Sequence, residues 1–527
     1  GCPKCYLPHT FNSIKQQTMA TTYFLHCKRI KEIKSLFPNH QLVEMWECEW
    51  DQLVKSNPQV KQFVDSQQIM PPLKPRDALY GGRTNAIRLH HKCGPNERIR
   101  YQDYTSLYPD IQKHGIFPIG HPKIVTENFG PISEYFGIVH CRILPPQNLF
   151  IPVLPARINN KLVFTLCFTC ASQLQSDECY HSDDERCITG TWVSLEIAEA
   201  VKHGYQVVQF FEVWHFEKTE QYDKSTEEGG LFTSYVNTFL KLKVEASGLP
   251  NHITDIDQYI RDYKANEGID LDKDKMIKNP GFRSVAKLML NSFWGRYGMN
   301  SNKVSYKMID EPADWFAMIS NDMYVIHHVD IIRNEFLQVF YSVNELMHEG
   351  SSTCNVVIAA FVTCQARLKL FAELNKLQER VLYFDTDSII FISRPDEYEP
   401  ELGDYLGQFT NEIDPAEGEY IEEFVSAGPK NYSYRFNTGI THCTVKGFTL
   451  NHVASQKINF DSMKNIVCNS QANKISIDQV KFGRNKHDWS IRTDIVSKDY
   501  GFVYDKRVVR PDLTTVSYGY KGASNSQ

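Results

Sequence analysis

The chain has 527 residues, of which 42% are hydrophobic and 12% aromatic, and its formal net charge at pH 7 is −6. These values predict a globular protein with several cores, and they exclude a disordered chain and a uniformly basic nucleic-acid binder. No apolar run approaches the roughly 20 residues that a membrane helix needs, so we expect no membrane association. The fourteen cysteines are scattered, with two clusters, which favours a reducing compartment with zinc sites over a disulfide scaffold.

The first segment, residues 1–56, is mixed in character and contains cysteines, and residues 43–48 are predicted to form a strand. Because the sequence opens in the middle of a cysteine motif, we expect it to be a fragment of a longer protein. Four prolines then predict a linker over residues 57–80. Gly81 and Gly82 mark the start of a second unit, in which strand-like sequence leads to Asp103.

A long and partly polar insertion covers residues 110–270 and contains a Cys/His cluster. Two close pairs of soft or borderline ligands predict a zinc site, because structural zinc is held by four such side chains. The predicted ligands are Cys167, Cys170, Cys179 and His181. The Cys-x-His spacing is closer than usual, and Cys187 competes as the fourth ligand.

Apolar periodicity predicts two helices further along the chain, at residues 283–295 and 356–379. On the first helix Lys287, Asn291 and Gly295 are spaced four residues apart and share a face, with Arg283 one turn earlier. A cationic stripe beside a small residue suits a nucleotide whose phosphates contact Arg and Lys while its base stacks nearby.

The most informative stretch is residues 383–388, which lies between two apolar runs and predicts a strand, an acidic tip and a second strand. Because strand side chains alternate between faces, Asp385 and Asp387 are expected to point the same way. Two converging carboxylates are costly without a cation, and hard oxygen ligands suit magnesium. A solvated acidic turn is the alternative for this tripeptide taken alone.

A third carboxylate, Asp103, ends a strand-like run and is followed by a turn at Ser106 and Leu107 and by Tyr108. Backbone N–H groups of such a turn can hold a polyphosphate, and the tyrosine offers an aromatic wall. Asp103 and Asp387 together can hold two magnesium ions, one activating a hydroxyl and one stabilising a leaving pyrophosphate.

With these three motifs the chain resembles a family B DNA polymerase, and more narrowly the protein-primed branch of small phages, linear plasmids, adenoviruses and Polinton/Maverick transposons. The resemblance covers residues 75–520 and implies a template-directed polymerase. It makes Asp103 and Asp387 the metal ligands, with Asp385 assisting, and Tyr108 the residue that excludes a ribose 2′-hydroxyl. It further implies contacts to the incoming dNTP from Ser106, Leu107, Arg283, Lys287 and Asn291. Trp294 stands where the family usually has tyrosine.

Two shorter motifs extend the resemblance. Residues 430–432 resemble the family's Lys-x-Tyr motif, in which Lys430 and Tyr432 steady the primer terminus. Residues 79–82 resemble its Tyr-x-Gly-Gly motif with the tyrosine displaced by one, which places Gly81 and Gly82 near the DNA.

The implied architecture is an α+β right hand with palm, fingers and thumb and an antiparallel palm sheet. Its implied parts are palm (81–109 and 351–435), fingers (271–298), thumb and C-terminal region (436–527), and insertions resembling the first and second terminal-protein regions (110–270 and 299–350). The second insertion would encircle the template and support strand displacement. The expected partners are DNA template and primer, dNTPs and a terminal priming protein.

The amino-terminal segment resembles the latter half of a very-short-patch-repair type endonuclease, in which Cys2, Cys5 and Cys48 would contribute to structural zinc. The upstream half with the catalytic Asp is outside the chain, so nuclease activity is not expected, and packed cysteines are the alternative to zinc. The absence of exonuclease motifs before the linker predicts a polymerase fragment that does not proofread.

Charge is strongly segregated in the last third of the chain. Residues 396–423 contain many acids and no Lys or Arg between them, whereas Lys474 to Arg510 is a basic region that can follow a phosphate backbone. Two alternatives stay open: a reverse transcriptase, and a decayed transposon protein that binds DNA without catalysis. Nuclear residence would suit a mobile element, and no basic targeting run decides it.

Overall fold

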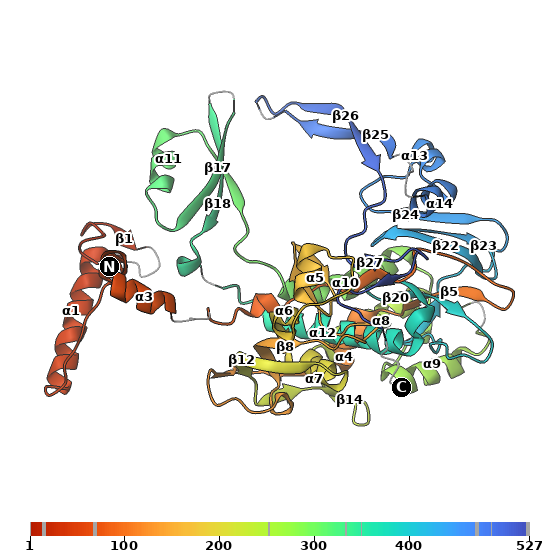
Figure 1. The fold of residues 1–527 in the computed structure, drawn as a ribbon, viewed down its shortest axis with the longest axis horizontal. Coiled ribbons are helices and arrows are strands. Elements are labelled where there is room, and N and C mark those ends of the chain that lie inside the picture. The colour runs from red at the N-terminus through yellow and green to blue at the C-terminus, as the bar shows by residue number, and fades with distance from the viewer. Residues whose placement is uncertain are drawn as a thin grey trace. The chain divides into compact units, whose positions relative to one another are not determined.

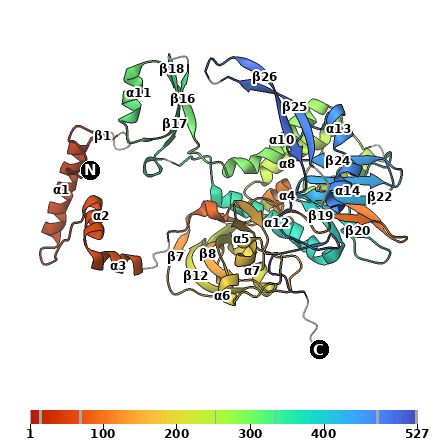
Figure 2. The same cartoon turned by 45° about the horizontal axis from the view of Figure 1, so that its top comes forward.

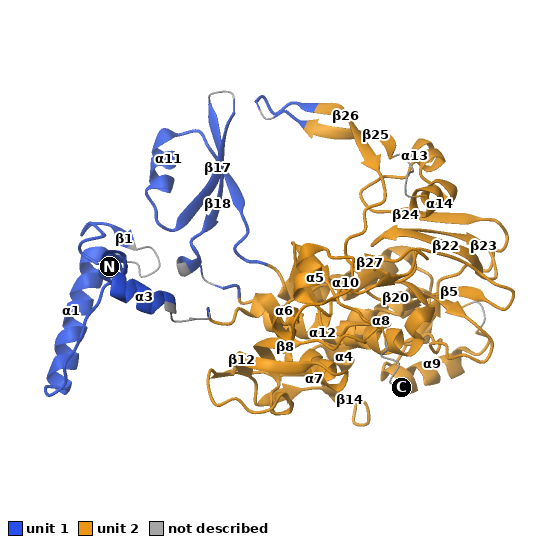
Figure 3. Cartoon of the chain, viewed as in Figure 1, with its two compact units in different colours: residues 1–71, 300–351, 484–491 blue, residues 72–299, 352–483, 492–527 orange. Residues whose placement is uncertain are grey.

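The computed structural model describes residues 2–12, 17–66, 71–250, 253–332, 335–348, 350–469, 474–485 and 487–522. The chain divides into two compact units (Figure 3). Unit 1 comprises residues 1–71, 300–351 and 484–491, and unit 2 comprises residues 72–299, 352–483 and 492–527. Among the helices of the described residues, none has the length and apolar character needed to cross a membrane.

Unit 1 contains a helical amino-terminal segment and a three-stranded antiparallel sheet of order β16-β18-β17. A small core of Ile309, Met318 and Val339 joins this sheet to α11. The elements are β1 (Phe11–Asn12), β2 (Gln17–Thr18), α1 (Met19–Leu36), α2 (Glu47–Ser56), α3 (Pro58–Ser66), β16 (Ser305–Ile309), α11 (Pro312–Ile319), β17 (Tyr324–Ile332) and β18 (Phe336–Val343).

The strand predicted at residues 43–48 is wrong. Residues 41–46 have no regular structure, and α2 begins at Glu47. Carboxylates in a first helical turn interact favourably with the helix dipole, and this turn contains Glu47 and Glu49. Glu49 also accepts a hydrogen bond from the Trp46 backbone N–H, which completes the cap.

The predicted linker over residues 57–80 is partly helical. It contains α3 and a 3₁₀ turn over Pro75–Ala78. Residues 67–70 of this stretch lie outside the described residues.

Unit 2 is built on a nine-stranded antiparallel sheet of order β24-β23-β22-β5-β20-β19-β3, in which β21 also pairs with β5 and β4 with β22. Figure 1 labels β5, β20, β22, β23 and β24 of this sheet. The predicted antiparallel sheet of an α+β fold is therefore confirmed. The strands are β3 (Thr84–Ala86), β4 (His90–Lys92), β5 (Arg98–Tyr104), β19 (Val381–Asp385), β20 (Ser388–Ser393), β21 (Phe409–Asn411), β22 (Ile421–Gly428), β23 (Asn431–Phe436) and β24 (Thr441–Val445).

Apolar side chains cover both faces of this sheet. Along β20, Ile389 and Phe391 belong to a core that includes α12 (Val356–Leu377), whereas Ile390 and Ile392 belong to a core that includes α14 (Phe460–Cys468). Because side chains alternate along a strand, β20 contributes to two helical layers at once. The predicted β19–β20 hairpin is thus present and buried on both sides.

Helices α4, α8, α10 and α12 pack against one another (Figure 2). The segment between α4 and α8, which falls within the predicted insertion, contains a four-stranded sheet of order β11-β8-β12-β7. The remaining bounds are α4 (Leu107–His114), β6 (Phe117–Ile119), β7 (Lys123–Val125), β8 (Gly137–Leu144), β9 (Ala156–Ile158), β10 (Lys161–Val163), α5 (Phe168–Gln173), α6 (Asp183–Arg186), β11 (Ile188–Val193), α7 (Ser194–Lys202), β12 (Gln206–His215), β13 (Lys218–Glu220), β14 (Tyr222–Asp223), β15 (Glu228–Gly229), α8 (Thr233–Glu245), α9 (Ile256–Glu267), α10 (Pro280–Tyr297), α13 (His452–Lys457), β25 (Ile475–Arg484), β26 (Ile491–Tyr500), β27 (Val508–Val509) and β28 (Thr515–Val516).

Candidate active site

The turn between β19 and β20 consists of two residues, because Asp385 pairs directly with Ser388. Thr386 in this turn has φ 59°, a conformation that β-branched residues rarely adopt. Its backbone N–H donates to the Arg83 carbonyl at 2.7 Å, and the Asp387 carbonyl accepts from the Tyr104 N–H at 2.8 Å. The turn is therefore held by the segment before β3 on one side and by the end of β5 on the other.

Asp103 and Asp387 interact electrostatically across the sheet, because Asp103 on β5 pairs with Ser388 on β20. Burial and the Asp387 carboxylate raise the pKa of Asp103 to about 8, with a further contribution from Glu412. Burial and the Asp385 carboxylate raise the pKa of Asp387 to about 6. Shifts in this direction identify crowded acids, and a bound cation would relieve their repulsion.

Asp385 is held differently from the other two aspartates. It accepts hydrogen bonds from Thr84 Oγ1 at 2.7 Å and from Lys430 Nζ at 2.9 and 2.8 Å on its two oxygens. Within the described part of the chain, sets of three or more side chains with ligand atoms within 4.8 Å of one another occur only at two cysteine sites. The three aspartates therefore do not form such a set, and Asp385 differs from Asp103 and Asp387 in being paired with a lysine.

The Lys-x-Tyr segment lies beside the same hairpin. Lys430 is in the turn between β22 and β23, and its backbone N–H donates to the Tyr383 hydroxyl at 2.8 Å. The ring of Tyr432 lies 4.8 Å from that of Tyr383, and its hydroxyl is 3.3 Å from the Tyr101 hydroxyl. Motifs predicted independently from the sequence are therefore neighbours in space.

Gly82 packs against the acidic turn. A Cβ at Gly82 would lie 2.7 Å from Thr386 Oγ1, whereas one at Gly81 would meet nothing closer than 4.0 Å. A buried ion pair fixes this segment: Arg367 binds both carboxylate oxygens of Glu196 and donates to the carbonyls of Tyr80 and Gly81. Both side chains of the pair are 1% exposed, so the backbone at Tyr80 and Gly81, which leads to Gly82, is held by a buried contact.

On the predicted nucleotide side, Tyr108 stacks on Trp294 with ring centroids 4.5 Å apart and an interplanar angle of 24°. This contact joins α4 to α10. Helix α4 begins at the buried Leu107, and the residue before it, Ser106, has φ 57°. The side chains of Arg283, Lys287 and Asn291 are exposed on α10. The charge of Lys287 attracts the carboxylate of Asp103 and partly offsets the rise in its pKa. The indole in place of the usual phenol therefore still supports Tyr108.

Sequence reasoning missed Lys243 on α8. Its Nζ lies 3.1 Å from Ser106 Oγ. Burial is the main cause that lowers the pKa of Lys243 to about 8, and repulsion from Arg283 and Lys287 adds to it. Three cations therefore gather near the turn after Asp103. A signal was present, since Lys243 follows the buried Leu240 at i+3 and so lies on the inward stripe of α8.

The structure brings together the side chains of both cysteine clusters that the sequence predicted. The ligand atoms of Cys167, Cys170, Cys179 and His181 all lie within 4.8 Å of one another, and Cys187 is outside the group. The sulfurs of Cys2, Cys5 and Cys48 form a second group, which has three members among the described residues. All fourteen cysteines fall in the described part of the chain and are free.

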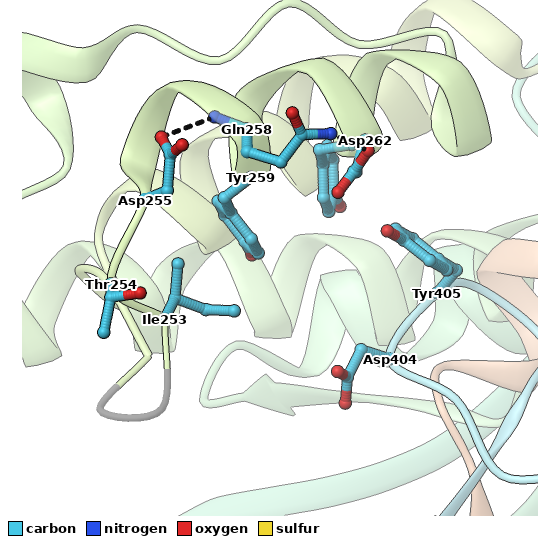
Figure 4. Close-up of a pocket in the computed structure, with 9 residues that line it drawn as sticks. Ile253, Thr254, Asp255, Gln258, Tyr259, Asp262, Asp404 and Tyr405 are labelled. Carbon is cyan, nitrogen blue, oxygen red and sulfur yellow. Dashed lines mark hydrogen bonds between the residues drawn. The ribbon is translucent and has the colours of Figure 1, made fainter.

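A separate pocket of about 290 Å³ lies between α9 and the segment at Asp404 and Tyr405 (Figure 4). Tyrosine rings and carboxylates line it, and the rings of Tyr263 and Tyr405 are 5.9 Å apart. The hairpin aspartates do not line this pocket, so it is distinct from the predicted active site.

The sequence model of the family described as DNA polymerase type B, organellar and viral, matches residues 74–256. Two curated relatives named "Probable DNA polymerase", from Neurospora intermedia and Podospora anserina, are each 24% identical over 346 and 370 residues. The alignments cover 63% and 65% of this chain but only 28% and 25% of the relatives, so the chain spans about a quarter of their length.

Among solved structures, phi29 DNA polymerase complexed with primer-template DNA is similar, with a TM-score of 0.50 and 14% identity over 86% of this chain and 67% of that chain. An orthorhombic crystal form of phi29 DNA polymerase gives the same TM-score with 13% identity, over 90% of this chain and 78% of that one. The fold is that of phi29 DNA polymerase. The predicted polymerase fold is therefore confirmed, whereas the endonuclease-like amino-terminal segment stays a prediction.

Proposed function

We propose that this chain is a DNA-directed DNA polymerase. In the proposed reaction the 3′-hydroxyl of a primer attacks the α-phosphate of a dNTP, a new P–O bond forms, and pyrophosphate leaves. The observation that carries the proposal is the electrostatic interaction of Asp103, on β5, with Asp387, in the turn before the neighbouring strand β20 of a phi29-like fold, with Lys430 and Tyr432 beside the hairpin.

Asp103 and Asp387 would hold the catalytic magnesium ions. Their raised pKa values fit this role, because two crowded buried carboxylates are stabilised by divalent cations. When bound, the two ions supply activation of the attacking hydroxyl and neutralisation of the leaving pyrophosphate. Asp385, which is paired with Lys430, would orient the hairpin.

The nucleotide would be held by Lys243, which contacts Ser106, and by the cations that act electrostatically on Lys243. Lys243, Lys287 and Arg283 supply positive charge for the triphosphate, as cations do at phosphoryl-transfer sites. Tyr108, supported by Trp294, forms the wall against which the deoxyribose packs and excludes a 2′-hydroxyl.

We further propose that priming uses a protein hydroxyl and serves the replication of a mobile element, plasmid or virus. The support is the phi29-like fold together with insertions at residues 110–270 and 299–350, which resemble the two terminal-protein regions. The partners would then be template DNA, dNTPs and a priming protein.

The test is primer extension on a recessed DNA template with dNTPs and Mg²⁺. Asp387→Ala should lower incorporation by at least about 100-fold, because it removes a direct metal ligand, while DNA binding persists. Glu401→Gln, which alters an exposed acid, serves as the matched control and should extend normally. Equal incorporation by Asp387→Ala and the unaltered chain would refute the assignment, and binding without extension by the unaltered chain would indicate a decayed element.

A further inference from the structure

The Cys/His cluster of the insertion plays no part in the proposed polymerase chemistry. The distances from His181 Nδ1 to the sulfurs of Cys170, Cys167 and Cys179 are 3.2, 3.5 and 3.7 Å. A tetrahedral zinc ion with Zn–S of about 2.3 Å and Zn–N of about 2.0 Å places sulfur and nitrogen ligands about 3.5 Å apart. The nitrogen–sulfur separations therefore match those of a zinc shell, and all four ligand atoms lie within 4.8 Å of one another.

Hydrogen bonding within the cluster does not explain this arrangement. A single imidazole nitrogen offers either one proton or one lone pair, so it cannot partner three sulfurs at once. A disulfide between Cys167 and Cys170 would leave Cys179 and His181 unaccounted for. A cation at the centre satisfies all four groups together.

The surroundings are those of a closed structural site. The three cysteines are 0, 1 and 2% exposed, which leaves no open position for a substrate. The Cys170 backbone N–H points at Cys167 Sγ from 3.4 Å, the kind of outer-shell contact that stabilises a metal-bound thiolate.

We propose that Cys167, Cys170, Cys179 and His181 bind one structural zinc ion that fastens the insertion to the C-terminal strap, defined as residues 515–519. The strap lies directly on the cluster: the Leu166 N–H donates to the Tyr518 carbonyl at 2.9 Å. Gly519, with φ 84°, approaches so closely that an added Cβ would be 2.6 Å from Cys167 Cβ.

The other end of the strap reaches the central sheet. The Thr515 N–H donates to the Ile87 carbonyl at 2.7 Å, and its Oγ1 donates to the Ala86 carbonyl at 2.8 Å. Ala86 on β3 pairs with Tyr383 on β19, the strand that ends at Asp385. Zinc at the cluster would thus stabilise the edge of the sheet that carries the acidic turn.

The first experiment is metal analysis of protein purified without chelator. A Cys48→Ser background removes the second cysteine cluster, and about one zinc per chain should remain in it, as expected for a four-ligand site. Adding Cys170→Ser should reduce zinc to below about 0.2 per chain, since a structural site needs all four ligands. Adding Cys187→Ser, a buried cysteine outside the group, should leave zinc unchanged.

A second measurement needs no ligand variant and therefore does not depend on the fold of Cys170→Ser. Titration of the Cys48→Ser protein with an organomercurial should release zinc as the thiols react and lower the melting temperature. It should also speed tryptic cleavage after Arg507, whose buried guanidinium donates to Thr515 and Ser517 of the strap. Zinc-free protein whose melting temperature and cleavage rate are unchanged by added zinc would overturn the proposal. Zinc that persists in Cys170→Ser but disappears in Cys187→Ser would overturn the assigned ligand set.

Discussion

Lys243 is half-buried among other cations, whereas Arg283 and Lys287 are exposed. Its lowered pKa of about 8 means that the folded chain binds this proton less tightly than the unfolded chain does. The charge therefore destabilises the fold below pH 8, and the cost disappears as the pH rises from 8 towards the ordinary lysine value of about 10.5. Such a cost fits the proposed nucleotide site, where a bound triphosphate would supply the missing negative charge.

Lys243→Met should consequently stabilise the chain and impair nucleotide binding. We expect a gain of about 1–3 kcal/mol at pH 7, a rise of about 1–3 °C in melting temperature, and a smaller gain at pH 10. The KM for dNTP should rise by about 10-fold or more, because a charge-assisted contact is lost. Thermal unfolding at the two pH values and steady-state kinetics measure both effects. The control is Lys241→Met, two residues earlier and paired with Glu245, which should neither raise the melting temperature nor raise the KM for dNTP. A lower melting temperature for Lys243→Met at pH 7 would contradict the argument.

At the level of single residues, the aspartates and the Lys-x-Tyr pair could be predicted because each belongs to a short local motif. For Lys243 the spacing of three residues from Leu240 was the only sign, and it was weak, since a lysine on an amphipathic helix is ordinarily on the surface and packing against α10 brings this one inward. Glu412, which helps to raise the pKa of Asp103, was missed for a similar reason: it lay in an acidic stretch that gave no sign of contact with the active site.

At the level of elements, the acidic turn depends on the glycine segment that packs against it. Gly82→Ala should push Thr386 away and shift Asp387, because its Cβ would lie 2.7 Å from Thr386 Oγ1. We expect incorporation to fall by about 10- to 100-fold, since displacements of about 1 Å at a reaction centre have effects of that size.

Primer extension by two further variants tests that mechanism. Gly81→Ala should retain activity, because the nearest atom to its Cβ is 4.0 Å away. Adding Thr386→Gly to Gly82→Ala removes the clashing side chain at a residue with φ 59° and should restore part of the lost rate. Equal losses for Gly81→Ala and Gly82→Ala would show that the contact with Thr386 is not the cause.

The strong apolar patterns predicted their elements well. Helices at residues 283–295 and 356–379 and the hairpin after them are present as α10, α12 and β19–β20. The short apolar run at residues 43–48 was misassigned, because such runs do not distinguish a strand from the approach to a helix, and the cap at Trp46 decided the outcome. The order of the nine strands could not be derived, since pairings such as β5 with β20 join residues far apart in sequence.

At the scale of the whole molecule, residues 300–351 belong to unit 1 although their flanking residues belong to unit 2. This boundary lies close to the predicted insertion at residues 299–350, whose role stays a prediction. The chain leaves and re-enters unit 2 at nearly one point: the Asn355 N–H donates to the Tyr297 carbonyl at 3.1 Å, and Arg296 donates to Thr353 Oγ1 at 2.9 Å. An insertion with adjoining ends can be removed without stretching the fold that carries it.

Replacing residues 300–351 with a flexible Gly/Ser linker of about six residues should therefore leave unit 2 folded, since such a linker spans the short gap between adjoining ends. Single-nucleotide incorporation on a recessed primer should stay within about 3-fold of the unaltered chain, because the three aspartates of the proposed active site and the cations proposed to bind phosphate lie in unit 2. Extension through a downstream duplex should be lost, since the excised region resembles the one that encircles the template. Comparing the two substrates separates the roles, with deletion of residues 1–71 as the control expected to retain both activities. Loss of single-nucleotide incorporation by a variant with an unchanged melting temperature would instead place part of the catalytic machinery in the insertion.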